Sequence, residues 1–130
     1  MQQSSHSSVK VFLADDSALI RKRVTAMLVE RAILVVGQAS TPQGSIDGIL
    51  AARPDVVVLD VQLEGGSGLQ VLRAVHQAAP GIAFVVFSNN AGPAYRKRYI
   101  AEGADRFLDK SSEFDQLVEA VATASLHALH

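Results

Sequence analysis

The sequence predicts an α/β fold in which a parallel sheet carries helices on both faces. Short apolar runs alternate along the chain with stretches of helical periodicity. The run Val56–Leu59 is apolar without alternation and is bounded by turn residues, as expected of a strand buried on both faces. No internal repeat or linker interrupts the alternation. We therefore expect one domain with five strands and five helices.

The composition is that of a small domain without disulfides. The chain has 130 residues, 48% of them hydrophobic and 19% charged, and a net charge of −1. This charge gives no general attraction to nucleic acid or anionic lipid. The lack of cysteine excludes thiol chemistry, and no apolar run approaches the ~20 residues of a membrane span. We expect a cytoplasmic protein with a disordered, polar tail over 1–8 and a folded domain over 9–130.

The first half of the chain is expected to form three strands and two helices. Ser17 and Thr41 are residue types that cap helix N-termini, and Pro42 suits the first position of the helix after Thr41. The β-branched residues of the second apolar run favour a strand. The expected elements are strands over Val9–Ala14, Ile33–Ala39 and Val56–Leu59, and helices over Ala18–Arg31 and from Pro42 to Arg53.

The second half is expected to contain two strands and three helices. Pro80 and Gly81 end the third helix, and Gly103 is a plausible C′ residue for the fourth. Ser111 or Ser112 is expected to cap the last helix. The expected elements are a loop over Glu64–Gly68, helices over Leu69–Ala78, Pro93–Gly103 and through Phe114–Leu126, and strands over Ile82–Phe87 and Asp105–Leu108.

Polar side chains end four of the five expected strands. They are Asp15 and Asp16, Asp60, Ser88 and Lys110. Because the carboxyl ends of parallel strands meet at one edge of a sheet, we expect them to converge. Two like charges ~4 Å apart repel by about 4 kcal/mol at an effective dielectric near 20, so this cluster needs cations. Lys110 can supply one, and the all-oxygen donors favour Mg²⁺ or Mn²⁺. Such a site suits phosphoryl transfer.

These five positions, in this order, resemble the receiver domain of two-component response regulators, the CheY-like family. The resemblance covers essentially the whole of 9–130. It implies a flavodoxin-like (βα)5 fold, a doubly wound parallel sheet of strand order 2-1-3-4-5. It also implies a signalling switch with intrinsic phosphotransfer and autodephosphorylation, and no other catalysis.

The resemblance implies a role for each acidic residue. Asp60 would accept a phosphoryl group from a phosphohistidine on a sensor histidine kinase or a histidine phosphotransfer protein, as in a phosphorelay. Asp15, Asp16 and Asp60, with the backbone carbonyl of Gln62, would hold Mg²⁺ (or Mn²⁺). Lys110 would pair with the phosphoryl oxygens.

The resemblance also implies a conformational switch. The Ser88 hydroxyl would move inward to the phosphorylated side chain, and Phe107 would be the switch aromatic, although it lacks a phenolic oxygen. Three positions depart from the family pattern. One is Glu64, which stands where the family often has a proline four residues after the acceptor. Ser111 stands where the family usually has a cis proline after Lys110, so either a strained cis bond is kept or this loop differs. Asn89 replaces a small residue and is expected to crowd access to the site.

Arg96, Lys97, Arg98 and Tyr99 form a basic and aromatic turn of the fourth helix. One interpretation is a solvated helix face. The other is a partner-docking surface, because domains of this family commonly signal through the fourth helix, fifth strand and fifth helix. A downstream protein or a second copy of the chain would bind there, with no direct role for nucleic acid.

Several functions stay open at this point. We expect a stand-alone response regulator, either a phosphorelay shuttle or a chemotaxis-type regulator. The alternatives in the family are the receiver half of a longer, for example DNA-binding, regulator and a pseudo-receiver that works without phosphorylation. A Mg²⁺-dependent phosphatase would need a second acid where Gln62 stands. A flavin-binding module would need a Ser/Thr-rich loop where Asp15 and Asp16 stand.

Overall fold

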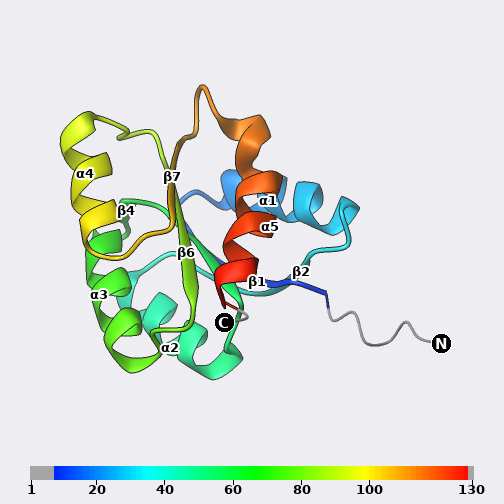
Figure 1. The fold of residues 1–130 in the computed structure, drawn as a ribbon, viewed down its shortest axis with the longest axis horizontal. Coiled ribbons are helices and arrows are strands. Elements are labelled where there is room, and N and C mark those ends of the chain that lie inside the picture. Colours follow the sequence, from blue (N-terminus) through cyan, green and yellow to red (C-terminus); the bar gives the residue numbers. More distant parts are fainter. Residues whose placement is uncertain (1–7, 129–130) are drawn as a thin grey trace.

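The computed structural model describes residues 8–128, and the expected disordered tail lies outside this range apart from Ser8. Five strands form one parallel sheet of order β2-β1-β3-β6-β7 (Figure 1). This is the predicted doubly wound order, with β6 and β7 as the fourth and fifth strands of the sheet. The strands are β1 (Lys10–Ala14), β2 (Leu34–Ala39), β3 (Val56–Leu59), β6 (Ala83–Ser88) and β7 (Arg106–Asp109).

Helices cover both faces of the sheet. In Figure 1, α1 and α5 lie on one side, and α2, α3 and α4 lie on the other. Each face has its own apolar core, and strand β1 contributes alternate residues to each. Strand β3 is buried on both faces, as its unbroken apolar run predicted. The helices are α1 (Ala18–Glu30), α2 (Pro42–Ala52), α3 (Gly68–Ala78), α4 (Pro93–Ala101) and α5 (Leu117–Ala128).

The predicted helix ends are largely present. The Ser17 hydroxyl accepts a hydrogen bond from the Ile20 N–H at 3.2 Å, and the Thr41 hydroxyl accepts one from the Gly44 N–H at 3.0 Å. Gly103 follows α4 with a φ of 114°, in the left-handed region that glycine tolerates best. These local capping signals could be recognised because each depends on residues close together in the sequence.

Two details differ from the sequence-based expectations. The expected loop over Glu64–Gly68 contains part of a small antiparallel hairpin of β4 (Gln62–Leu63) and β5 (Gly66–Ser67). The last helix is preceded by a 3₁₀ turn, η2 (Phe114–Gln116), and is not capped by Ser111 or Ser112. Instead, the Ser111 N–H and hydroxyl both donate to the Asp109 carboxylate, at 2.8 and 2.6 Å. This local turn competes with the capping role.

Candidate functional site

The sheet brings the predicted polar side chains together at the carboxyl edge of its strands. Asp15 and Asp16 follow β1, Asp60 follows β3, Ser88 ends β6 and Lys110 follows β7. Backbone hydrogen bonds between neighbouring strands continue to this edge, so the side chains leave it from fixed positions. For example, the Lys110 N–H donates to the Ser88 carbonyl at 3.0 Å. Parallel pairing therefore creates a polar cluster from positions far apart in the sequence.

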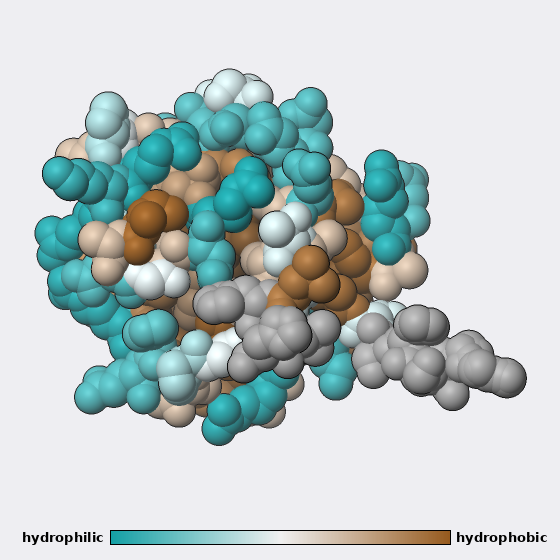
Figure 2. Space-filling view, in the orientation of Figure 1, coloured by the Kyte–Doolittle hydropathy of each residue, from teal (hydrophilic) through white to brown (hydrophobic). Residues whose placement is uncertain are grey.

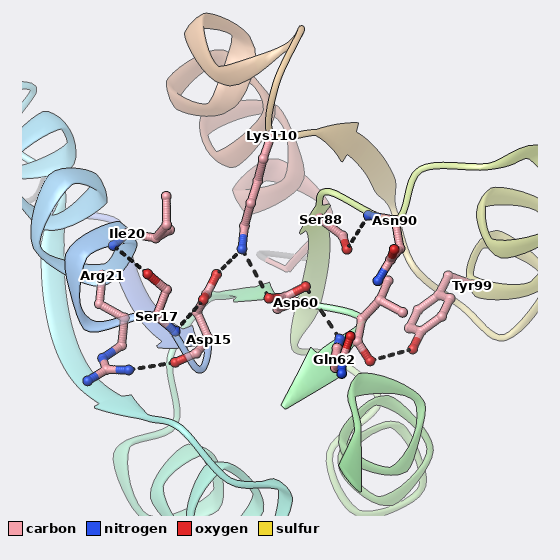
Figure 3. A network of polar contacts seen from close by, with 11 residues as sticks. Asp15, Ser17, Ile20, Arg21, Asp60, Gln62, Ser88, Asn90, Tyr99 and Lys110 are labelled. Carbon is pink, nitrogen blue, oxygen red and sulfur yellow. Dashed lines mark hydrogen bonds and ion pairs between the residues drawn. The ribbon is translucent and has the colours of Figure 1, made fainter. Parts of the chain in front are cut away.

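Lys110 lies between two carboxylates at the centre of this cluster. Its Nζ is 2.7 Å from an Asp15 oxygen and 3.0 Å from an Asp60 oxygen (Figure 3). The exposed fraction of the Lys110 side chain is 6%, and that of each carboxylate side chain is 8%. A buried cation placed in this way compensates two negative charges that would otherwise repel each other across a medium of low dielectric.

Burial and charge pairing shift the pKa values of this group in opposite senses. Burial raises the pKa of the Asp15 carboxyl, and the hydrogen bond from Lys110 offsets only part of this effect. Burial alone would lower the pKa of Lys110, but the adjacent Asp15 and Asp60 carboxylates outweigh it and raise that pKa. Lys110 therefore stays charged at neutral pH, and a further cation near Asp15 would favour the charged form of its carboxyl.

The three carboxylates form a set suited to a hard divalent metal. Asp15, Asp16 and Asp60 each offer an oxygen within 4.8 Å of the others. Asp16 is exposed, whereas the other two are buried, so an ion can reach the set from solvent. The Gln62 N–H points to the Asp60 carboxylate at 3.4 Å. An all-oxygen donor set of this charge fits Mg²⁺ or Mn²⁺ better than a softer metal.

A cavity of about 270 Å³ opens beside the acids and gives a ligand access to Asp60. Ser88 lines it and is fully buried, and its hydroxyl accepts a hydrogen bond from the Asn90 N–H at 3.0 Å. Asn89, which was expected to crowd this access, is exposed and lies in the cavity lining. The lining residues are Asp16, Ser17, Ile20, Asp60, Gln62, Ser88, Asn89, Asn90 and Lys110.

One residue of this region was missed by sequence reasoning. The Arg21 guanidinium on α1 donates to the Asp15 carbonyl at 2.6 Å and to the Gln38 side chain on β2 at 3.2 Å. It thereby fixes the backbone that carries the acid pair. The available signal was a cation one helical turn after the Ser17 cap, on the side of α1 that faces the end of β1.

The expected partner surface on α4 needs a correction at Tyr99. Its exposed fraction is 2%, because this side of α4 packs on the sheet, so Tyr99 is not part of an exposed surface. The Tyr99 ring meets the buried Phe107 ring edge to face, with centroids 6.0 Å apart. Burial raises the pKa of Tyr99 to about 12, so its hydroxyl stays protonated well into the alkaline range.

The cations of α4 are exposed, and one of them also contacts β7. Arg96 donates to the Phe107 carbonyl at 2.6 Å, and its guanidinium lies 5.1 Å from the centroid of the Phe107 ring. Arg98 is 3.6 Å from Glu102 on the same helix. Lys97 is exposed. The surface expected from the sequence is therefore reduced to Arg96, Lys97 and Arg98.

The loop after Lys110 contains no cis bond. No peptide bond within residues 8–128 is cis, so the Lys110–Ser111 bond is trans. The missing proline left two possibilities, a strained cis bond or a loop that differs from the family pattern. The structure has the second. The hydrogen bonds from Ser111 to Asp109 give this loop its turn.

Comparison with known proteins agrees with the fold. The response regulator receiver domain family matches residues 11–122. Response regulator GacA of Pseudomonas aeruginosa is 30% identical over 114 residues, which are 87% of this chain and 53% of that protein. The probable transcriptional regulatory protein NarL of Mycobacterium tuberculosis is 31% identical over 122 residues, which are 93% of this chain and 56% of that protein.

Solved structures of response regulators have the same fold as this chain. The signal receiver domain of the putative response regulator NarL from Mycobacterium tuberculosis has a TM-score of 0.86 and 30% identity, covering 93% of this chain and 98% of that one. A LuxR-family two-component response regulator from Aurantimonas has a TM-score of 0.87 and 25% identity, covering 92% and 86%. The chain belongs to the response regulator receiver domain family.

Family membership has two direct consequences. Receiver domains of response regulators work as phospho-switches and bind Mg²⁺ at an acidic pocket, which matches the kind of site found here. The chain spans about half the length of the curated relatives it matches, and many of these are transcriptional regulators. Family membership therefore shows the receiver domain of this chain, and not the activity of those whole proteins.

Proposed function

We propose that this chain is a phosphorylation switch in which Asp60 accepts a phosphoryl group in a Mg²⁺-dependent reaction. The observation that carries this proposal is the position of the Asp60 carboxylate. It is paired with Lys110 at 3.0 Å, is grouped with two further acids and lines an open cavity. A strand-end aspartate with no role in substrate chemistry would need neither the buried lysine nor the two extra acids.

The proposed transfer uses the side chains already in place. An Asp60 oxygen attacks the phosphorus of a phosphohistidine on the donor protein, and an O–P bond forms as the N–P bond breaks. The imidazole nitrogen leaves with the bonding electron pair. Lys110 offsets the charge of the phosphoryl oxygens, while the Ser88 hydroxyl can exchange its bond from Asn90 for a bond to the new phosphoryl group.

Asp15, Asp16 and Asp60, with the backbone carbonyl of Gln62, would hold the Mg²⁺ (or Mn²⁺). The metal, when bound, neutralises the negative charge that gathers on the phosphoryl oxygens. Asp16 is the exposed member of this set, and a cation at the buried Asp15 would offset part of the burial that raises the pKa of its carboxyl. The donors of the phosphoryl group would be a sensor histidine kinase or a histidine phosphotransfer protein.

We propose that signal output passes through protein contacts on the α4, β7 and α5 face. Figure 2 shows hydrophilic side chains gathered around α4, and Arg96, Lys97 and Arg98 give this helix a basic surface. The guanidinium of Arg96 lies over the buried Phe107 ring, so this surface is in contact with β7, the strand that ends next to Lys110. If a double Lys97→Ala, Arg98→Ala variant binds every downstream partner as well as the wild type does, the surface is wrongly assigned.

The expectation of a stand-alone regulator stays a prediction, as does the alternative of a receiver half within a longer, DNA-binding regulator. Cytoplasmic localisation is part of the proposal, because the phosphoryl donors of this family act there. Within residues 8–128, no helix combines the length and apolar character needed to cross a bilayer.

Intact mass measurement tests the central step. The full chain is incubated with acetyl phosphate and Mg²⁺, and with acetyl phosphate and excess EDTA. We expect a phosphoryl adduct of about 80 Da in the first sample, labile in base like other acyl phosphates, and little in the second. Asp60→Asn keeps the size of the side chain and removes the nucleophile, so it should give no adduct.

Asp55→Asn is the matched control, because Asp55 lies at the opposite end of β3 and bonds the Lys10 N–H there. It should be phosphorylated like the wild type. An adduct that persists in Asp60→Asn would move the acceptor to another residue. A wild-type chain without adduct would favour the pseudo-receiver, in which the same fold binds partners without phosphorylation.

A further inference from the structure

Tyr99 places a buried phenol beside the acceptor loop, where the proposed transfer does not use it. Of the two tyrosines in the chain, Tyr95 is 48% exposed and Tyr99 is 2% exposed. The Tyr99 hydroxyl points from α4 to the carbonyl of Val61, 3.4 Å away (Figure 3). Val61 directly follows Asp60, so this contact joins α4 to the residue next to the proposed acceptor.

The Val61 carbonyl is shared by two helices. It also accepts a hydrogen bond from the Gly68 N–H at the start of α3, at 2.7 Å. A carbonyl oxygen has two lone pairs and can serve both donors. The end of β3, the start of α3 and the last turn of α4 thus meet at one atom. A shift of the acceptor loop must therefore change the contact that Tyr99 makes.

The contact has room to change. An O–H···O hydrogen bond is usually about 2.7–2.8 Å long, so the bond at 3.4 Å is stretched. A cavity of about 410 Å³ borders it, lined by Val61, Leu69 and Tyr99 among others, and leaves space for the loop and the ring to move. The stretched bond and the adjacent cavity indicate a contact that can tighten or break rather than a fixed structural bond.

We infer that Tyr99 is a positioning residue of the acceptor loop and that its hydroxyl transmits the state of Asp60 to α4. This inference rests on the proposed function of Asp60. Arg96, one turn earlier on α4, holds the Phe107 carbonyl at 2.6 Å, so the same helix is attached to the end of β7 as well. Phe107 and Tyr99 pack ring against ring in the core. Phe107 carries no hydroxyl, so the phenol of this pair belongs to α4.

Carbon-13 NMR of the full chain labelled at tyrosine Cζ tests the inference directly. The two tyrosines give two signals, which are assigned with Tyr95→Phe and Tyr99→Phe. Beryllofluoride with Mg²⁺ serves as the probe for an occupied Asp60. We expect the Tyr99 signal to move by more than the Tyr95 signal, and to stay in place in Asp60→Asn. Backbone amide signals of Asp60 and Ser88 report independently whether the probe has bound.

A Tyr99 signal that stays fixed while those amide signals move would overturn the inference and leave the proposed function intact. If the amide signals do not move in the wild type, the proposed function fails. The positioning role is then tested only by the Mg²⁺ affinity of the Tyr99→Phe variant.

Tyr99→Phe keeps the ring and loses the hydroxyl. It should shift the Val61 and Gln62 amide signals and weaken Mg²⁺ binding about two- to tenfold, the usual range for one hydrogen bond. Tyr95→Phe should do neither, and equal behaviour of the two variants would also overturn the inference.

Discussion

At the scale of single residues, Tyr99 shows how burial converts an ordinary side chain into a pH-sensitive one. Its pKa is raised from 10.0 to about 12, chiefly by burial. Between pH 10 and pH 12 the unfolded chain therefore loses this phenolic proton while the folded chain keeps it. The folded state then binds more protons, so the free energy of unfolding falls as the pH rises through this window.

We expect Tyr99→Phe to remove this part of the pH dependence. The maximal slope for one group is about 1.4 kcal/mol per pH unit, so the two pH units correspond to roughly 2–3 kcal/mol. Urea unfolding at pH 9, 10, 11 and 12 would measure it in the wild type and the variant. Lys110, whose raised pKa acts in the same direction, is present in both proteins and cancels. If the free energy of unfolding falls equally with pH in the two proteins, Tyr99 is not a buried, protonated phenol. Tyr95→Phe serves as the control at the exposed tyrosine.

The same residue marks a limit of sequence reasoning. Asp15, Asp16, Asp60, Ser88 and Lys110 could be located because each ends an apolar run, and parallel strands align their ends. Tyr99 was assigned to the surface as part of one basic and aromatic turn with the cations before it, and α4 has no clear apolar stripe that separates it from them. Which side of such a helix faces the sheet is decided by packing against Phe107. Because Phe107 lies on β7, outside the helix, the sequence of α4 alone does not indicate this side.

At the scale of secondary structure elements, α3 begins in direct contact with the backbone of Asp60, the proposed acceptor. A Cβ atom at Gly68 would collide with the backbone carbonyl oxygen of Asp60 and lie 3.2 Å from the Leu59 side chain. The Gly68 N–H also donates to Val61. The start of the helix and the end of β3 therefore fit only without a side chain at position 68.

We expect Gly68→Ala to destabilise the fold by about 1–3 kcal/mol, the range found when atoms are inserted into a packed site. It should also slow phosphorylation of Asp60, because the neighbouring carbonyl has to shift. Thermal unfolding and the rate of adduct formation measure both effects. Gly81→Ala is the control, since nothing lies within 4 Å of a Cβ added there, and its stability should be unchanged or raised by up to about 1 kcal/mol. A Gly68→Ala protein that matches Gly81→Ala would refute this tight fit.

The elements themselves were largely predictable, and the exceptions have a common cause. Caps and strand runs depend on residues within a few positions of each other, so Ser17, Thr41 and the β3 run gave correct boundaries to within a residue or two. The β4–β5 hairpin and the 3₁₀ turn before α5 are two- and three-residue elements. Elements this short have no hydrophobic periodicity that could predict them. The hairpin also depends on a distant contact, because the Glu64 N–H donates to the Ser40 carbonyl after β2 at 2.8 Å.

At the scale of the whole molecule, two apolar cores stabilise the sheet while the acidic edge opposes folding. Asp15 and Asp60 are buried on the same edge with one lysine between them, and Asp16 brings a third carboxylate. The folded state thus gathers negative charge that the unfolded chain keeps dispersed in water. A ligand that binds this cluster only when the chain is folded must increase the free energy of unfolding.

We therefore expect Mg²⁺ to stabilise the whole domain against urea. At a concentration one hundred times its dissociation constant, the gain is about 2.7 kcal/mol for one site. Sodium chloride at matched ionic strength separates binding from general screening of charge. Asp16→Asn is the informative variant, because this exposed carboxylate can be removed with little change to the metal-free core. If Mg²⁺ stabilises Asp16→Asn as strongly as the wild type, the ion acts elsewhere on the molecule. If it stabilises only the wild type, Mg²⁺ binds at the acidic edge and relieves the folding penalty of its clustered charges, as the proposed phosphoryl transfer requires.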